Sequence, residues 1–556
     1  MAHEIGRADY AARYGPTAGD RVRLGDTNLV ALIERDESGY GDEVLRGWGK
    51  TMRTGLMMSD RLPSASELDL LIANVVVIDP VLGVVKASIG VKDGLIAGVG
   101  RAGNPDIVDD PDLLVGSATA PIYGQGFIAT PGGIDTHVHL VQPRLIPVAL
   151  AAGMTTLITG GLNDNPAFNL RRMFEAFEHH PVNLGILGRA AAAVPEPLVR
   201  QIESGACGLK VHEDYAGYPS VIDCALTVAD LHDVQIAMHT DGINESCELS
   251  ETVAAIGGRA IHAYHVEGIG GGHAPDILAI VGVPNVIGSS TTPTIPYGKN
   301  VVAEHHAMMW SVHGMNPRVP SDRAMVADRI RDNTMRAESV LHELGAISII
   351  NSDSQGMGRI GESIRRTWQL AHQMKTLAGG DPPHDNPRIL KYLAKYTINP
   401  ARAHGVHRWV GSLEPGKIAD IVLWRPEFFG VKPELVLKGG YVAWGALGEG
   451  NASIPQSEPL VYGPHWGGHG RAAASLSANF VSAAAAAGDF RRQVGGRRRA
   501  IAVAGTRQVA KRHMLYNQAN PRIEIDPRTV EIRIDGQLLP DLPGDDLPLN
   551  RRYFLL

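Results

Sequence analysis

Residues 134–140 read Ile-Asp-Thr-His-Val-His-Leu, and this short β-branched stretch decides how the rest of the chain is interpreted. In a strand, alternate side chains share one face, so His137 and His139 can point together at one metal ion. A pair of histidines can equally satisfy hydrogen bonds in an ordinary core. A metal site is favoured over a core hydrogen bond only if further candidate ligands lie at the ends of other strands of the same sheet.

Such further candidates share one position, the end of an apolar run. They are Lys210, His212, Asp214, His239, His265 and Asp353. Imidazole and carboxylate groups are ordinary ligands of divalent metals.

The apolar runs alternate with amphipathic segments, which predicts an α/β fold with a TIM-type (β/α)8 barrel. Active sites of such barrels lie at the C-terminal ends of the strands. The candidate ligands fall at or near the ends of the first, fourth, fifth, sixth and eighth runs. The predicted strands are residues 134–140, 155–159, 183–187, 208–212, 235–240, 260–265, 285–289 and 347–353. Helices are expected at residues 220–233, 248–256 and 362–376.

We predict that this barrel, residues 130–411, is inserted in a small β-sheet domain. Residues 1–129 supply the first part, with a hairpin signal in the Lys-Asp-Gly at residues 92–94, and residues 412–470 supply the second. The long connection at about residues 300–330 predicts a flap over the catalytic face.

The remaining residues, 471–556, are expected to form an α+β extension. Its alanine- and serine-rich part, residues 471–488, predicts a surface helix, and the basic run at residues 491–499 is typical of a solvated charged face. Alternation over residues 530–538 predicts another hairpin.

Composition narrows the function classes. A net charge of −7 over 556 residues argues against a general binder of nucleic acid or anionic membranes. The three cysteines are too few for a disulfide framework, which favours a reducing compartment. Neither a signal peptide nor an apolar run of about 20 residues is found, so we expect a cytoplasmic protein.

Lys210 is the unusual candidate ligand, because a lysine ammonium has no lone pair to offer a metal. Carbon dioxide can convert the neutral amine into a carbamate, which could bridge two cations. The alternative is a lysine packed in the barrel with its head paired to an acid. The histidines and Asp353 around it favour the bridge, and two metal ions would activate water for hydrolysis of a C–N bond in an amide, ureide or cyclic imide.

Three further residues are candidates for catalytic roles. His212 could donate a hydrogen bond to the substrate carbonyl, Asp214 could orient a neighbouring histidine, and His313 on the flap could protonate a leaving amine. The alternative for each is an ordinary polar residue at the rim.

The chain resembles the urease α (catalytic) subunit over nearly its full length. The matching stretches are residues 14–21, 102–106, 134–139, 208–214, 267–276, 352–355, 395–400 and 552–556. Several of them, such as Gly-Leu-Lys-Val-His-Glu-Asp at residues 208–214, are close to diagnostic.

The resemblance implies a urease that hydrolyses urea to ammonia and carbamate with a metal-bound water or hydroxide. It implies two nickel ions held by His137, His139, carbamylated Lys210, His239, His265 and Asp353. It also implies substrate contacts from His212 and Gly356, with His313 as general acid and Asp214 and Arg329 as its electrostatic partners. Expected protein partners are β and γ subunits, in a trimer of three-chain units, and nickel-loading accessory proteins.

The chain departs from the family pattern around the pocket. Val312 stands where the flap cysteine is usual, and Gly314 where a second histidine is usual. Residues 160–169 replace a longer loop that walls the active site. Gln142 replaces a cysteine, and residues 242–243 replace a small polar pair.

Three functions remain open. A nickel urease subunit for a small neutral substrate is favoured over a urease-derived amidohydrolase for a substituted urea or small amide. The shortened loop at residues 160–169 is the reason for considering this second function. A non-catalytic assembly subunit is third, because it would have no chemical need for six intact ligand positions.

Overall fold

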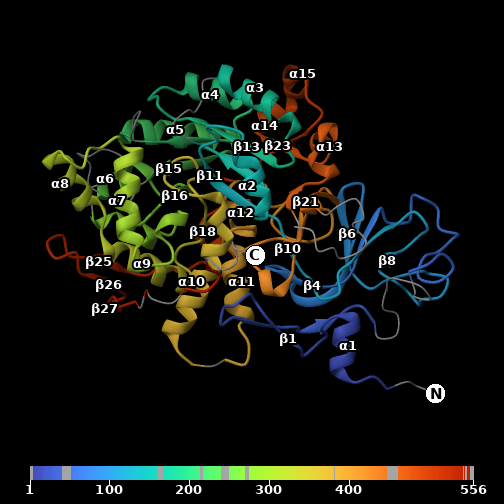
Figure 1. Ribbon diagram of the computed structural model, residues 1–556. Coiled ribbons are helices and arrows are strands. Elements are labelled where there is room, and N and C mark those ends of the chain that lie inside the picture. The colour runs from blue at the N-terminus through green and yellow to red at the C-terminus, as the bar shows by residue number, and fades with distance from the viewer. Residues whose placement is uncertain are drawn as a thin grey trace.

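The computed structural model has a parallel barrel beside a mixed β-sheet, with the C-terminal segment packed on the barrel (Figure 1). The described residues are 4–39, 52–160, 167–212, 217–239, 249–268, 275–380, 382–447, 461–542, 544 and 547–550.

The barrel strands follow one another in sequence order, and each pairs in parallel with the next. A parallel bridge between Val138 and Ser354 brings the chain after the last strand back to the first, so the barrel closes at its C-terminal end. This confirms the predicted TIM-type fold. The strands are β11 (Gly133–Val138), β12 (Met154–Thr159), β13 (Asn183–Arg189), β14 (Gly208–Val211), β15 (Gln235–His239), β16 (Ile261–Tyr264), β17 (Val286–Ser290) and β18 (Ile349–Ile350).

Helices pack around the barrel because their apolar faces cover strands that are buried on both sides. The predicted helices at residues 220–233, 248–256 and 362–376 correspond to α5, α6 and α10. The α-helices described between β11 and residue 411 are α2 (Leu145–Ala151), α3 (Ala167–Ala176), α4 (Pro195–Glu203), α5 (Pro219–His232), α6 (Leu249–Ile256), α7 (Val301–Val312), α8 (Pro320–Arg329), α9 (Asp332–Glu343), α10 (Ser363–Ala378), α11 (Asn386–Ala394) and α12 (Ile398–Ala403).

The β-sheet beside the barrel takes strands from both sides of the barrel segment, as predicted. β10 pairs in parallel with β4 and antiparallel with β19, so the N-terminal and later strands form one sheet. Asp93 and Gly94 have positive φ angles of 52° and 78° in the tight turn between β5 and β6, as the Asp-Gly signal predicts. The strands are β3 (Arg35–Asp36), β4 (Leu70–Asp79), β5 (Gly83–Lys92), β6 (Leu95–Gly100), β9 (Ala120–Tyr123), β10 (Ile128–Pro131), β19 (Ile421–Trp424), β20 (Leu435–Lys438), β21 (Tyr441–Leu447) and β22 (Val461–Pro464).

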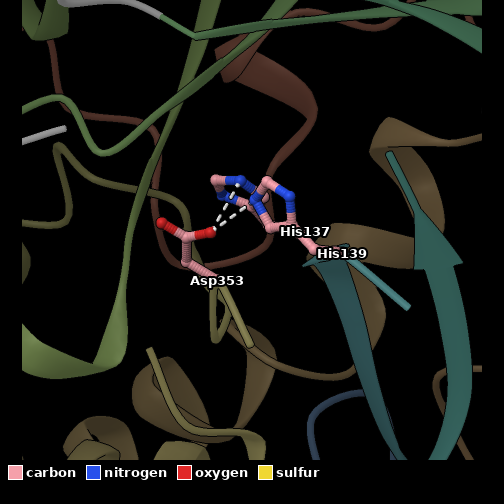
Figure 2. A group of neighbouring side chains, drawn as sticks. All are labelled: His137, His139 and Asp353. Carbon is pink, nitrogen blue, oxygen red and sulfur yellow. Dashed lines mark ion pairs between the residues drawn. The ribbon is translucent and has the colours of Figure 1, made fainter. Parts of the chain in front are cut away.

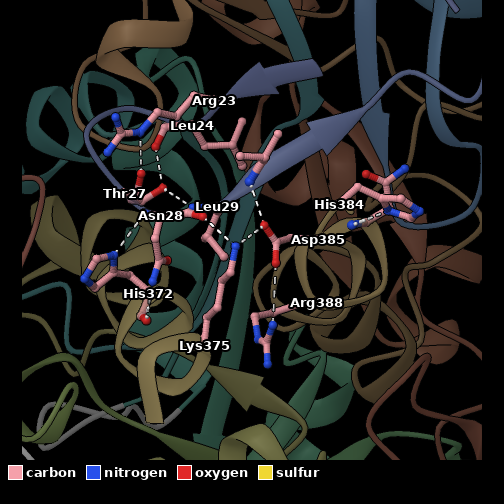
Figure 3. Close-up of polar contacts among 12 residues, drawn as sticks. Arg23, Leu24, Thr27, Asn28, Leu29, His372, Lys375, His384, Asp385 and Arg388 are labelled. Atoms are coloured by element: carbon pink, nitrogen blue, oxygen red, sulfur yellow. Dashed lines mark hydrogen bonds and ion pairs between the residues drawn. The ribbon is translucent and has the colours of Figure 1, made fainter. Parts of the chain in front are cut away.

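The N-terminal segment is fastened to α10 and the start of α11 by a buried carboxylate (Figure 3). Asp385 accepts hydrogen bonds from the Val30 amide and from Lys375 Nζ, both at 2.8 Å. Lys375 also donates to the Asn28 carbonyl at 2.8 Å. Segments about 350 residues apart in the chain are therefore held together at one point.

The expected surface helix over residues 471–488 is wrong. Two short helices, α13 (Gly470–Ser475) and α14 (Ala483–Ala487), flank a fully buried strand, β23 (Ala478–Val481), which pairs in parallel with β13 of the barrel. The buried Arg498 donates to the carbonyls of His180 and Ala478 and to Asn479 Oδ1. The alanines of this region lie mostly in the two short helices, whereas β23 itself reads Ala-Asn-Phe-Val, so the alanine-rich composition hid a strand between two helices.

The hairpin expected at residues 530–538 is confirmed as β26 (Ile532–Ile534) and β27 (Gln537–Leu538). Within the described part of the chain, every helix is too short or too polar to cross a membrane.

Candidate metal centre

Three predicted ligands converge at the C-terminal end of the barrel (Figure 2). His139 Nε2 lies 2.8 Å from Asp353 Oδ1, and His137 Nε2 lies 3.3 Å from the same oxygen. One ligand atom from each residue lies within 4.8 Å of the other two. The buried imidazole–carboxylate set fits a divalent metal ion such as nickel or zinc.

Strand pairing brings these ligands together. The Asp353 amide donates to the His137 carbonyl at 2.8 Å, and the His139 amide donates to the Ser354 carbonyl at 2.9 Å. Asp353 has a φ of 57°, a left-handed conformation that is uncommon outside glycine. The backbone thus places the carboxylate beside the two histidines although it lies more than 200 residues away in the chain.

Asp135, two residues before His137, supports the same backbone. Its Oδ1 accepts hydrogen bonds from the amides of His137 and Ser352, each at 3.1 Å. Burial raises the pKa of Asp135 to about 7, although these hydrogen bonds oppose the rise. Through its two hydrogen bonds, the Asp135 carboxyl joins the strand that carries the histidines to the loop that carries Asp353.

Lys210 lies fully buried on β14, beside the three-residue cluster. Its Nζ is 3.3 Å from His137 Nε2 and donates to the Gly160 carbonyl at 2.9 Å. The lysine head therefore faces the histidine cluster, where it contacts an imidazole and a backbone carbonyl.

His239 and His265 form a second pair in the same interior. His265 Nε2 lies 2.9 Å from His239 Nδ1, and the ring centroids of His137 and His265 are 5.5 Å apart. The ring of His212 lies next to His239, with centroids 4.1 Å apart. The six predicted metal ligands thus occupy one buried region, with the buried His212 beside His239.

Electrostatics keep the donors in the forms that bind metals. Burial and the positive charge of Lys210 lower the pKa of His137 well below its usual value. Burial also lowers the pKa of His139, against the opposing effect of Asp353. Burial alone would raise the pKa of Asp353, but the hydrogen bond and charge of His139 outweigh it and lower the pKa to about 2. At neutral pH these groups are therefore neutral imidazoles and an ionised carboxylate.

Gly356 lies against the ligands. A Cβ at this position would be 2.7 Å from Asp353 Oδ1 and 2.8 Å from Nε2 of His139. The neighbouring Gln355 Oε1 accepts hydrogen bonds from the amides of Val141 and Gln142, which ties this loop to the chain after β11. Only glycine fits here without moving a ligand.

The predicted flap corresponds to α7, α8 and their connection. His313 caps α7 with an exposed side chain, and Arg329 is the last residue of α8. Glu304 on α7 pairs with Arg359 at 2.6 Å and with Arg366 at 3.5 Å, which anchors the helix to the segment after the metal ligands.

Some predictions lie outside the described residues. Asp214 is one of them, as are residues 161–166 of the shortened loop and residues 242–243. The roles given to His212, His313, Arg329 and Gly356 stay predictions.

The sequence analysis missed two features of this region. Tyr264 stacks against His137, with ring centroids 3.9 Å apart. Glu338 on α9 is fully buried, and burial raises its pKa to about 7 although the neighbouring Ser290 and Thr294 oppose the rise. A polar residue inside an apolar run was the available signal for Tyr264. No sequence signal distinguished Glu338, because a glutamate is ordinary in an amphipathic helix.

Known proteins with similar sequences cover the whole chain. Residues 128–469 match the amidohydrolase family, and residues 3–122 match the N-terminal domain of the urease alpha-subunit. Urease subunit alpha 1 of Streptomyces avermitilis is 50% identical over 553 residues, covering 98% of this chain and 99% of that protein. Urease subunit alpha of Haloquadratum walsbyi is 48% identical over 570 residues, covering all of both chains.

Among solved structures, a D-hydantoinase (dihydropyrimidinase) from Thermus sp. has a TM-score of 0.50 at 16% identity. The match covers 67% of this chain and 95% of the hydantoinase. At this identity the likeness concerns the amidohydrolase fold. The full-length sequence matches carry the more specific conclusion, that the chain belongs to the urease alpha-subunit family.

Proposed function

We propose that the chain is a catalytic urease subunit that hydrolyses urea to ammonia and carbamate. The observation that carries the proposal is the convergence of His137, His139 and Asp353, with Lys210 Nζ 3.3 Å from His137 Nε2 and the His239–His265 pair in the same interior. The names of the full-length relatives support urea as the substrate.

The cofactor in this proposal is a pair of nickel ions. The residues that would hold it are His137, His139, Lys210, His239, His265 and Asp353. Metal ions in such a site polarise a carbonyl and lower the pKa of water. Lys210 would take part as a carbamate, formed when its neutral amine adds to carbon dioxide and loses a proton.

The remaining roles belong to side chains around this centre. His212, whose ring lies beside His239, would donate a hydrogen bond to the urea carbonyl and hold it in place. His313 would protonate the leaving amine, with Asp214 and Arg329 tuning its charge. For His313 to reach the substrate the flap has to close, because its side chain is exposed here.

The similarity to proteins named urease alpha subunits supports an assembly with β and γ chains. We propose a trimer of such three-chain units, loaded by nickel-delivering accessory proteins. A cytoplasmic location stays a prediction.

The test is ammonia release by the chain, purified with its co-purifying partners and incubated with nickel and bicarbonate. Urea and N-methylurea are compared as substrates. Turnover of urea well above that of N-methylurea is expected. Turnover of N-methylurea alone would replace the proposal with the substituted-urea alternative, and two bound nickel ions without turnover of either would favour a non-catalytic subunit.

A further inference from the structure

Tyr264 lies against two of the proposed ligands, His137 and Lys210. It is the last residue of β16 and is fully buried. Its ring is nearly parallel to the His137 imidazole, at an interplanar angle of 13° and a centroid distance of 3.9 Å. Lys210 Nζ lies over the same ring, 5.0 Å from its centroid.

The hydroxyl group fixes this ring across the barrel. Tyr264 Oη donates to the Thr136 carbonyl at 2.5 Å, and Thr136 directly precedes His137 on β11. The edge of His262 packs against the ring from the same strand, with centroids 4.8 Å apart and an interplanar angle of 86°. Tyr264 is therefore held at both its hydroxyl and its ring.

His137 needs such a support more than an ordinary metal-binding histidine does. Metal-binding histidines usually donate their second ring nitrogen to a carboxylate, a carbonyl or water, and this contact fixes the ring plane. Within the described residues, the buried Nδ1 of His137 has no hydrogen-bond partner. The stacked ring of Tyr264 is the contact that can hold the imidazole plane, since stacked aromatic rings resist rotation and tilting.

We propose that Tyr264 is a positioning residue of the metal centre, which orients His137 through its stacked ring. The inference rests on the proposed metal centre. Tyr264 touches two of the ligand residues but supplies no ligand itself, so its effect should be seen in metal affinity.

The experiment measures nickel affinity by equilibrium dialysis in the presence of bicarbonate. Tyr264→Phe keeps the ring and removes the hydroxyl, whereas Tyr264→Met keeps most of the volume and removes the flat ring. We expect nickel affinity to fall about 10- to 100-fold in the methionine variant, the usual effect of losing a contact that orients a ligand. The phenylalanine variant should stay within about threefold of the wild type, because the stack persists.

The control is Tyr392→Met. Tyr392 is a buried tyrosine of α11 whose hydroxyl donates to Glu343. This variant should lower thermal stability without changing the nickel affinity of the folded protein. A purely structural role of Tyr264 would give the same pattern as this control.

The outcomes separate this inference from the proposed function. Equal nickel affinity of the wild type and Tyr264→Met would refute the inference alone. A wild type that binds no nickel would refute the proposed centre and the inference with it. Should the methionine variant fail to fold, Tyr264→Leu takes its place in the comparison. If the phenylalanine variant loses as much nickel affinity as the methionine variant, the role proposed for the ring is refuted.

Discussion

Replacing Gly356 by alanine tests whether the loop after Asp353 has been shaped to fit the metal ligands. The added methyl carbon would lie 2.7 Å from Asp353 Oδ1 and 2.8 Å from both Cδ2 and Nε2 of His139. A comfortable contact is about 3.5 Å, so these atoms have to separate by roughly 0.7 Å. Metal–ligand distances vary by only about 0.2 Å, so the strain should fall on the metal site.

We expect the Gly356→Ala variant to fold, with a loss of about 1–3 kcal/mol in the free energy of unfolding from overpacking. Its nickel affinity should fall on the order of 100-fold, because a displaced ligand costs at least as much as a lost supporting contact. Nickel binding is measured by dialysis with bicarbonate, and stability by guanidinium unfolding of the metal-free protein.

Gly298→Ala is the matched control, since the nearest atom to its added carbon is the Gly544 carbonyl oxygen at 3.6 Å. That variant should bind nickel like the wild type. Nickel affinity of Gly356→Ala within threefold of the wild type would show that the loop yields freely, and the reasoning from steric fit would be refuted.

Two further predictions concern the flap and the base of the barrel. Glu304→Gln removes the charge that pairs with Arg359, so α7 should be cut faster in limited proteolysis. The control Glu175→Gln, on the surface helix α3, should leave the rate of cleavage in α7 unchanged. Equal cleavage rates for the two variants would exclude an anchoring role of Glu304. His262 Nδ1 lies 2.9 Å from His404 Nε2, and burial lowers the pKa of His404 to about 3 and that of His262 well below its usual value. The unfolded chain therefore binds protons below about pH 6.5 while the folded chain does not, so stability should fall as the pH drops from 6.5 towards 3, by at most about 1.4 kcal/mol per pH unit for each histidine. The His404→Gln variant should show a shallower fall in guanidinium midpoints between pH 7 and pH 4, and an unchanged slope would contradict the assignment.

The barrel could be predicted because its strands carry two signals at once. Strands buried on both faces are continuous apolar runs, and polar residues at their C-terminal ends stand out against that background. His137, His239 and Asp353 were found in this way, and the structure brings all three into one interior.

Contacts between distant segments were beyond the reach of the sequence pattern. β23, Ala-Asn-Phe-Val, was mistaken for part of a helix because alanine-rich helical segments flank it on both sides. Tyr264 was overlooked because an aromatic residue at the end of a strand is ordinarily a core residue. The pairing of Glu304 with Arg359 joins segments 55 residues apart, and only the fold brings these charges together.

The most direct test of the central claim is anomalous diffraction at the nickel edge from crystals grown with nickel and bicarbonate. We predict two peaks within the barrel, in contact with His137, His139, His239, His265 and Asp353, and extra density that extends Lys210 as a carbamate between them. A single peak, or an unmodified Lys210 that still donates to the Gly160 carbonyl, would contradict a bridged pair of metal ions.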